Sequence, residues 1–314
     1  MTILLPTPKN IEGASQILQK GGVVAFATET VYGLGCDTFN PHAIEQIYAL
    51  KGRPKNNPTI AHILDASWAH ELTEYWNEQC DQLAKAFWPG ALTLVLPKKE
   101  RVPKEACGGR NTIAIRSPSH IVARQLLESF GSAISAPSAN KSGYISPTTA
   151  KHVEDEFGEK LQIIDGGACE EGIESTVLSL ISTPTILRPG TISEADITKI
   201  IGKVSLTNPC EQNDSPGTTA LHYSPHTATI LLTEKEMNEL DDGDCVAITM
   251  NGAPKKAKVQ IQMPVDPKEY GTQLYSSLRE ADAIGAKQIV IENPPSTRGW
   301  SAVLDRLNRC AANL

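Results

Sequence analysis

The sequence predicts a mixed α/β fold divided into two domains, and three observations lead to this prediction. The chain has 314 residues, 40% of them hydrophobic, which is enough to build two cores. Short β-rich runs alternate with helical stretches over residues 11–203, and the alternation resumes after a break rich in proline, glycine and polar residues. We therefore predict a first domain over residues 1–205, a linker over residues 206–226 and a second domain over residues 227–314.

The first domain is predicted to be a mixed sheet whose faces are covered by helices. Runs rich in β-branched residues predict strands at residues 22–26, 59–64, 92–96, 112–115, 133–135, 161–164, 175–180 and 185–187. Helical periodicity predicts helices at residues 11–20, 41–50, 79–87, 119–129, 148–157 and 193–201. Several of these helices begin with a Ser, Thr or Asn cap or with a proline in the first turn, which supports their boundaries.

The second domain is predicted to be a small, Rossmann-like α/β unit of about 90 residues, which is within the usual size of a domain. Strands are expected at residues 229–232, 245–250, 259–263 and 288–291, with helices at residues 269–284 and 298–312. The sequence before it, residues 206–225, loses periodicity and is typical of a linker.

Composition narrows the class of protein. The net charge of -7 and a pI near 5.6 argue against a general nucleic-acid-binding surface. The seven cysteines are scattered and form no C-x-x-C pair, and the histidines show no metal-binding spacing, so we expect no stable zinc site. No apolar run is long enough to span a membrane and the N-terminus does not resemble a signal peptide, so we expect no membrane contact and a cytoplasmic location.

Residues 51–58 form the most informative segment, because a short loop with a glycine and two prolines carries the cations Lys51, Arg53 and Lys55. This local excess of positive charge opposes the acidic balance of the chain and favours a bound anion such as phosphate.

Two further arginines follow a common pattern of strand, arginine and proline turn. Arg116 ends the strand at 112–115, and Arg188 ends the strand at 185–187. Together with Lys51 and Arg53, they could converge on one crevice and bind a triphosphate and a carboxylate. The alternative for any one of them is a strand-end or surface ion pair.

Polar loops follow two predicted strands. Residues 28–35 carry hydroxyls and glycines directly after a strand, where open α/β sheets bind ligands. Residues 135–143 and 146–148 supply hydroxyls and amides that could bind phosphates, although no Walker or G-x-G-x-x-G motif is present. An ordinary turn and a helix cap at Ser146 are the alternatives.

Two histidines lie close to the candidate site segments in the sequence. His62 lies in an apolar strand and His222 lies in the predicted linker, and neither has the nucleophile and orienting partner of a catalytic triad. A lone strand histidine is more often a structural residue, so covalent catalysis is not predicted.

Taken together, these motifs resemble the L-threonylcarbamoyladenylate synthase family with the YrdC-like fold. The resemblance rests on residues 28–35, 51–58, 88–90, 116–120, 138–143, 146–148, 174–177 and 188–190. Residues 215–225 and the Asp305-Arg306-Leu307 sequence resemble the long, two-domain form of that family. The resemblance implies a twisted mixed sheet with helices around a concave pocket, followed by the small second domain.

The resemblance also implies an activity. Members of this family make threonylcarbamoyl-AMP and pyrophosphate from L-threonine, bicarbonate and ATP, as the first step towards N6-threonylcarbamoyladenosine beside the tRNA anticodon. Mg²⁺ is expected to arrive with ATP and not on protein side chains. The expected partners after this step are the tRNA threonylcarbamoyl transferase proteins that receive the product.

The resemblance assigns site residues by position. It implies that L-threonine is bound by Thr30, His62, Arg116, Ala136 and Thr176. It implies that the nucleotide is bound by Lys51, Arg53, Asn57, Thr112, Ser138, Asn140, Ser146, Arg188 and Tyr223, with Lys51 and Arg53 as the catalytic cations. Tyr223 would reach back from the linker, which would act as a lid.

Two other functions are considered. A different carbamoyl-handling enzyme of the same fold, such as a hydrogenase-maturation carbamoyltransferase, would carry zinc-finger cysteine pairs, and this sequence has none. An RNA-binding module would bind RNA in a strongly salt-dependent way without turning over a nucleotide.

Overall fold

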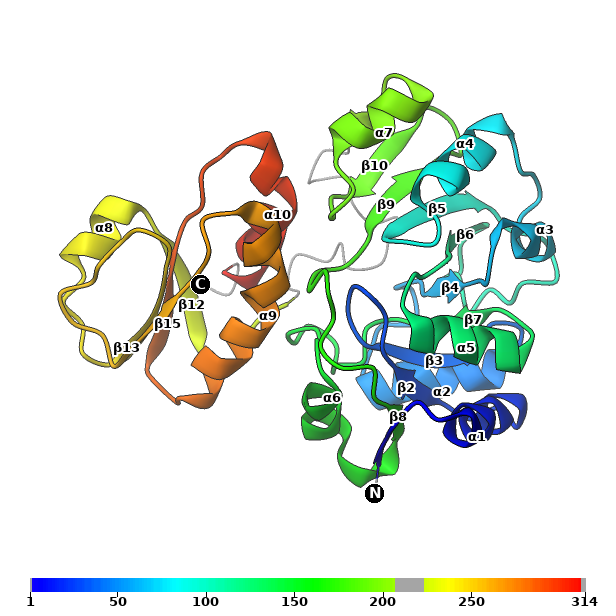
Figure 1. The fold of residues 1–314 in the computed structure, drawn as a ribbon, viewed down its shortest axis with the longest axis horizontal. Helices are drawn as coiled ribbons and strands as arrows, with labels where there is room; N and C mark the ends of the chain where they lie inside the picture. Colours follow the sequence, from blue (N-terminus) through cyan, green and yellow to red (C-terminus); the bar gives the residue numbers. More distant parts are fainter. Residues whose placement is uncertain (1, 207–222, 312–314) are drawn as a thin grey trace.

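The computed structural model describes residues 2–206 and 223–311, which form a large and a small α/β unit (Figure 1). Residues 207–222 lie outside the described residues, and with them most of the predicted linker, His222 and Cys210. None of the described helices is long and apolar enough to cross a membrane. The six cysteines in the described part of the chain are free and buried.

The large unit is built on an eleven-stranded sheet that is mixed, as the sequence predicts, although the strands at residues 3–4, 33–37 and 205–206 were not predicted. In spatial order its strands are β1 (Ile3–Leu4), β8 (Gln162–Ile164), β2 (Val24–Phe26), β3 (Gly33–Asp37), β7 (Ile134–Ser135), β4 (Ile60–His62), β6 (Thr112–Arg116), β5 (Leu92–Pro97), β9 (Thr176–Ser179), β10 (Thr185–Arg188) and β11 (Ser205–Leu206). The pairs β4–β6 and β5–β9 are parallel, whereas β2–β3, β4–β7, β5–β6 and β9–β10 are antiparallel.

Helices cover both faces of this sheet. On one face, α1 (Pro8–Gln19) packs with α5 (Ile121–Phe130) against β2, β7 and β8. The other face is covered by α2 (Pro41–Lys51), α3 (Ala69–Leu72), α4 (Glu78–Phe87), α6 (Ala150–Phe157) and α7 (Glu194–Ile201), with short 3₁₀ turns η1 (Ala66–Trp68) and η2 (Gly158–Lys160). Side-chain caps begin several of them: the Asn40 side chain accepts from two backbone amides of α2, and Ser193 caps α7.

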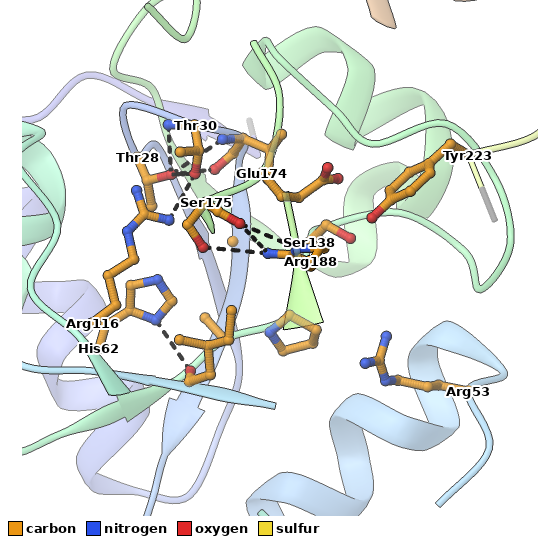
Figure 2. Close-up of a pocket in the computed structure, with 15 residues that line it drawn as sticks. Thr28, Thr30, Arg53, His62, Arg116, Ser138, Glu174, Ser175, Arg188 and Tyr223 are labelled. Carbon is orange, nitrogen blue, oxygen red and sulfur yellow. Dashed lines mark hydrogen bonds between the residues drawn. The ribbon is translucent and has the colours of Figure 1, made fainter. Parts of the chain in front are cut away.

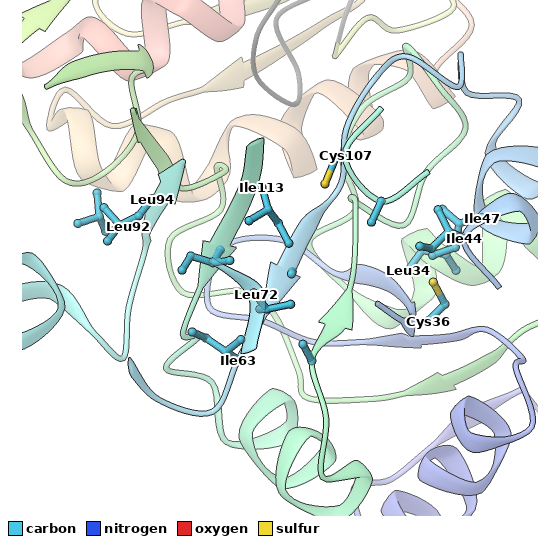
Figure 3. Packing of buried hydrophobic residues seen from close by; sticks show 14 of the residues in the cluster. Leu34, Cys36, Ile44, Ile47, Ile63, Leu72, Leu92, Leu94, Cys107 and Ile113 are labelled. Carbon is cyan, nitrogen blue, oxygen red and sulfur yellow. The ribbon is translucent and has the colours of Figure 1, made fainter. Parts of the chain in front are cut away.

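The core between α2 and β3 shows how the site is anchored. Leu34, Ile44 and Ile47 are fully buried and lie close together in Figure 3. Each such side chain contributes about 1.5–3 kcal/mol by leaving water. This packing fixes α2, whose C-terminal residue Lys51 begins the cationic loop, against the strand that follows the polar segment 28–32.

The two glycines of the segment 28–35 belong to a strand. Gly33 and Gly35 lie in β3, antiparallel to β2, so the alternative of an ordinary glycine-containing turn does not hold at these two residues. A Cβ atom at Gly35 would meet the Phe26 ring at 2.6 Å and Ile134 at 2.8 Å, so the residue is glycine because two neighbouring side chains cross its backbone. Residues 27–32, which include the polar residues Thr28, Glu29 and Thr30, therefore form the connection between two neighbouring strands.

The small unit has a four-stranded parallel sheet, as predicted for a Rossmann-like domain. Its strand order is β12 (Ala228–Leu232), β15 (Gln288–Glu292), β13 (Cys245–Thr249) and β14 (Val259–Gln262). Its helices are α8 (Glu234–Glu239), α9 (Pro267–Ala283) and α10 (Ser301–Cys310), the last preceded by η4 (Arg298–Trp300). Figure 1 shows α9 and α10 between this sheet and the large unit, and α8 on the opposite side.

A carboxylate closes the edge of this small sheet where its parallel strands end. Glu292, the last residue of β15, is 2% exposed. Its Oε2 accepts hydrogen bonds from three consecutive backbone amides after β13, those of Met250 (2.6 Å), Asn251 (2.9 Å) and Gly252 (2.8 Å). The three amides form a concave nest of the kind that binds anions.

Candidate active site

The polar segments predicted from the sequence meet in one crevice of the large unit (Figure 2). Its walls come from the β2–β3 connection, the ends of β4, β6 and β10, the loop after β7 and the residues before β9. Eight of the predicted site residues line it: Thr30, Arg53, His62, Arg116, Ala136, Ser138, Arg188 and Tyr223. Segments up to about 190 residues apart in the sequence thus form one polar pocket.

Strand register explains why His62 and Arg116 lie together. They are the last residues of β4 and β6, and they are direct neighbours in this parallel pair. The carboxyl ends of neighbouring parallel strands meet at one edge of a sheet, where ligands usually bind. Ala136 joins them because its amide donates to the Ile60 carbonyl at 2.8 Å.

Arg116 is held by three groups. Its Nη2 lies 2.7 Å from Glu29 Oε1, its Nη1 donates to Thr30 Oγ1 at 2.9 Å, and its Nε donates to the Gly90 carbonyl at 3.1 Å. Both Arg116 and Glu29 are 3% exposed, so the pair is almost fully removed from water. Sequence reasoning identified Arg116 and Thr30 but missed Glu29, although Glu29 lies inside the segment 28–35.

Arg116 keeps the pKa of Glu29 low although the carboxyl is buried. Burial alone would raise the pKa of this carboxyl, but the nearby Arg116 guanidinium and the hydrogen bond from the Ser119 amide lower it below its ordinary value. Glu29 is therefore a carboxylate at neutral pH and fixes one side of the Arg116 guanidinium. A substrate carboxylate would reach an arginine that is already oriented.

His62 is neutral. Burial, and secondarily repulsion by Arg116, lower its pKa to about 4. Its Nδ1 lies 3.2 Å from the Ile60 carbonyl, and its ring meets the Phe26 ring edge-on. A neutral imidazole next to Arg116 can offer a hydrogen bond to a bound hydroxyl or amine without adding charge.

The opposite side of the crevice carries two arginines. Figure 2 shows Arg116 and His62 on one side, Arg53 and Tyr223 on the other, and Arg188 with Ser175 between them. Arg53 Nη2 donates to Asn57 Oδ1 at 2.6 Å and to the Pro58 carbonyl at 2.9 Å, and Arg188 Nη2 donates to the Ser175 carbonyl at 3.0 Å. Burial lowers the pKa of Arg53 to about 10, so it remains a cation at neutral pH.

Lys51 lies behind the pocket wall. It is 2% exposed, and its Nζ donates to the carbonyls of Ser138 (2.5 Å) and Asn140 (2.6 Å). Burial and the nearby Arg53 lower its pKa well below the ordinary value. In this structure Lys51 supports the loop that carries Ser138 into the crevice.

The remaining predicted residues do not line the crevice. The Asn57 side chain accepts from Arg53, the Asn140 Nδ2 donates to the Tyr144 carbonyl (2.9 Å), and Thr176 Oγ1 donates to the Ile192 carbonyl (2.7 Å). Ser146 is fully buried. Thr112 begins β6, whereas Arg116 ends it, so the two lie about 13 Å apart along the strand. Their roles in binding stay predictions.

Glu174 is a pocket residue whose role the sequence did not predict. Its Oε1 accepts from Ser146 Oγ at 2.6 Å, and its Oε2 accepts from Tyr275 Oη at 2.9 Å and from Arg306 Nε at 3.0 Å. Tyr275 and Arg306 belong to α9 and α10 of the small unit. The motif 174–177 pointed to this segment, but no sequence pattern connects it to helices about 100 residues away.

Tyr223, the first described residue after the gap, lines the pocket as predicted. Its side chain is fully buried and its ring stacks on that of Tyr275 at 5.5 Å between centroids. Its φ of 64° is in the left-handed region, which is uncommon for a residue other than glycine. Residues 207–222 of the predicted lid lie outside the described residues, whereas Ser224, which follows Tyr223, donates its amide to the Gly143 carbonyl at 2.9 Å.

The carboxylates of Glu29 and Glu174, in and next to the pocket, each form an ion pair with an arginine. Glu29 is paired with Arg116, and Glu174 is paired with Arg306. Among residues 2–206 and 223–311, no group of three or more His, Cys, Asp or Glu side chains could hold a metal ion.

Comparisons with known proteins identify the family of this chain. The Sua5_yciO_yrdC family model, described as Telomere recombination, matches residues 16–190, and the model described as threonylcarbamoyl-AMP synthase, C-terminal domain, matches residues 192–312. The chain is 36% identical to a threonylcarbamoyl-AMP synthase of Pyrococcus abyssi, with 99% of this chain and 98% of that protein covered. It is also 36% identical to a threonylcarbamoyl-AMP synthase of Bacillus subtilis, with 96% and 92% covered.

A solved structure extends the comparison to the arrangement of both units. The crystal structure of Pyrococcus abyssi Sua5 complexed with L-threonine superposes with a TM-score of 0.94 at 34% sequence identity. The match covers 99% of this chain and 98% of that one.

Proposed function

This chain belongs to the threonylcarbamoyl-AMP synthase family, and we propose that it joins L-threonine, bicarbonate and ATP into threonylcarbamoyl-AMP with release of pyrophosphate. The observation that carries the proposal is the two-sided pocket. Arg116, Thr30 and His62 form one side, whose polar groups suit an amino acid, and Arg53 and Arg188 supply the cations of the rest of the pocket.

In the proposed complex, the carboxylate of L-threonine binds Arg116, which Glu29 and Thr30 hold in place. Thr30 and the neutral His62 offer hydrogen bonds to the remaining polar groups of the amino acid. Ala136 supplies a small wall that leaves room for the substrate. The choice of L-threonine as the ligand is supported by the similarity to the Pyrococcus abyssi protein, which was crystallised in complex with L-threonine.

The proposed reaction proceeds in two steps. The threonine amine adds to CO₂ derived from bicarbonate and loses a proton, which forms a carbamate and, overall, water. A carbamate oxygen then attacks the α-phosphorus of ATP, and the bond to the pyrophosphate group breaks. Negative charge gathers on the carbamate and the phosphates during this step, and Arg53 and Arg188 are placed to stabilise it.

We assign different roles to the two cations predicted as catalytic. Arg53 lines the pocket and is proposed to contact the phosphates. Lys51 is proposed to hold the loop at Ser138 against the nucleotide, because its amine already binds two carbonyls of that loop. Mg²⁺ is proposed to enter as the ATP complex and to neutralise part of the phosphate charge.

The decisive experiment measures pyrophosphate release from ATP by the purified protein, with L-threonine and bicarbonate each present or omitted and with L-serine as a control substrate. Release that requires threonine, bicarbonate and Mg²⁺ supports the proposal. Pyrophosphate release at the same rate with and without threonine and bicarbonate would point to another carbamoyl-handling or ATP-consuming enzyme. Salt-sensitive RNA binding without any turnover would point to an RNA-binding module.

The product is proposed to serve N6-threonylcarbamoyladenosine formation beside the tRNA anticodon. The transferase proteins that accept it, and the cytoplasmic location, stay predictions from the sequence.

A further inference from the structure

We propose that Arg306, in α10 of the small unit, is a positioning residue that sets the geometry of the nucleotide side of the pocket. The inference rests on the proposed function and deepens it, because it makes the second unit part of the substrate site. It predicts that a residue outside the pocket lining controls the affinity for ATP.

The contacts of Arg306 carry the inference. Its side chain is fully buried, although it is the largest of the fully buried side chains described. Its Nε donates to Glu174 Oε2 at 3.0 Å, its Nη1 donates to the Pro189 carbonyl at 2.8 Å, and its Nη2 donates to the Glu174 carbonyl at 3.3 Å. Glu174 lines the pocket, and Pro189 follows Arg188, which also lines it. One guanidinium thus fixes two segments of the pocket wall.

The same guanidinium contacts a third pocket segment. Its Cζ lies 5.4 Å from the centre of the Tyr223 ring, at a distance typical of a cation–π contact. Tyr223 in turn stacks on Tyr275, whose hydroxyl donates to the Glu174 carboxylate. Two side chains of the small unit, Arg306 and Tyr275, therefore contact three parts of the pocket wall: Glu174, the backbone next to Arg188, and the ring of Tyr223.

Charge explains why this arrangement matters for a nucleotide. Glu174 is a buried acidic group facing a pocket whose proposed ligand is polyanionic. Arg306 balances that charge through its Nε, and its Nη1 lies 2.7 Å from Asp305 Oδ2. Without Arg306 the carboxylate would lose its partner and would compete with phosphate for Arg188, or it would take up a proton. Either change weakens the nucleotide side of the pocket and leaves the Arg116 side intact.

Two tyrosine variants distinguish an effect on the pocket wall from a general weakening of the contact between the two units. Tyr275→Phe removes a hydroxyl that reaches the Glu174 carboxylate of the pocket. Tyr144→Phe removes a hydroxyl that joins the two units through Asp282 at 2.5 Å, and neither residue of that pair lines the pocket. Both changes delete one oxygen and one contact between the units.

The experiment measures ATP affinity by calorimetry in the full-length protein, together with KM and kcat for ATP and for threonine. We expect Arg306→Lys and Tyr275→Phe to weaken ATP binding about tenfold or more, with a smaller effect on the KM for threonine. Tyr144→Phe should stay within about twofold of wild type. In an Arg306→Met background, Glu174→Gln should restore part of the lost ATP affinity, because the unpaired charge is gone.

Two results would overturn the inference: equal ATP affinities of Tyr275→Phe and Tyr144→Phe, or a Glu174→Gln change that gives Arg306→Met no recovery. Because calorimetry needs no turnover, these outcomes differ from a failure of the proposed function, in which wild-type protein shows no pyrophosphate release that depends on threonine. If Arg306→Met does not fold, the ATP affinities of Arg306→Lys and Tyr275→Phe, compared with that of Tyr144→Phe, still test the inference.

Discussion

Replacing Arg116 by methionine should destabilise the protein in a way that depends on pH. The change leaves the Glu29 carboxylate buried without its cation, and breaking a buried ion pair on one side costs about 3–5 kcal/mol. We therefore expect the free energy of unfolding to fall by about that amount at pH 7.5. The threonine KM should rise roughly 10- to 150-fold, because a charged hydrogen bond to the substrate carboxylate is lost.

The sign of the pH effect follows from the pKa of Glu29. In the wild type this pKa is lowered from 4.5, so the stabilisation by Glu29 is present above pH 4.5 and is lost as the pH falls below it. In Arg116→Met, burial would act alone and would raise the pKa, so acidification relieves the cost of the buried charge. The difference between variant and wild type should shrink by up to about 1.4 kcal/mol for each pH unit below the raised pKa of Glu29 in the variant.

Urea unfolding of the wild type, Arg116→Met, Glu29→Gln and the double variant at pH 7.5 and 5.5 measures these energies. The double variant should recover at least half of the stability lost in Arg116→Met, because it contains no buried charge at this position. If the double variant is as unstable as Arg116→Met, or if the loss is the same at both pH values, the ion pair does not control this part of the site.

Three other predictions concern the same pocket. His62→Gln should make the stability less dependent on pH on the acid side. The pKa of His62 is lowered from 6.5 to about 4, so the free energy of unfolding of the wild type falls by up to about 3 kcal/mol as the pH drops from 6.5 to 4. Urea titrations of both proteins at several pH values measure the difference. Thr30→Val removes the acceptor that orients Arg116 and should raise the threonine KM about tenfold without changing the KM for ATP; equal changes in both constants would contradict it. Lys51→Met should weaken ATP binding at least tenfold by releasing the loop at Ser138, whereas Lys141→Met, an exposed lysine bonded to one carbonyl, should have little effect.

The sequence predicted the sheet and its helices because their signals are local. Periodicity, Asn40 and Ser193 at helix starts, and β-branched runs depend on neighbouring residues, and the structure confirms the mixed sheet of the large unit and the parallel sheet of the small one. Glycine was ambiguous: Gly35 is required by the ring of Phe26, a contact between strands that a linear pattern does not reveal.

The candidate site was predictable where charge and strand ends coincide. Arg116 and Arg188 end strands in the sequence and line the pocket in the structure. Glu29 was missed because an acidic residue between two threonines looks like any exposed turn until the fold brings Arg116 next to it. Arg306 was seen only as part of a family motif, because its partner Glu174 is 132 residues away. Long-range pairing of buried charges is a property of the folded chain.

The nest at Met250, Asn251 and Gly252 has a consequence for how the small unit should be understood. A parallel sheet of this kind usually offers such amides, at the carboxyl ends of its strands, to a phosphate brought from outside. Here the chain supplies its own anion, since the Glu292 carboxylate accepts all three amides. A phosphate approaching these amides would find them already bound to the Glu292 carboxylate. The unit thus mimics a ligand-bound state permanently, with an internal carboxylate in the role of the ligand.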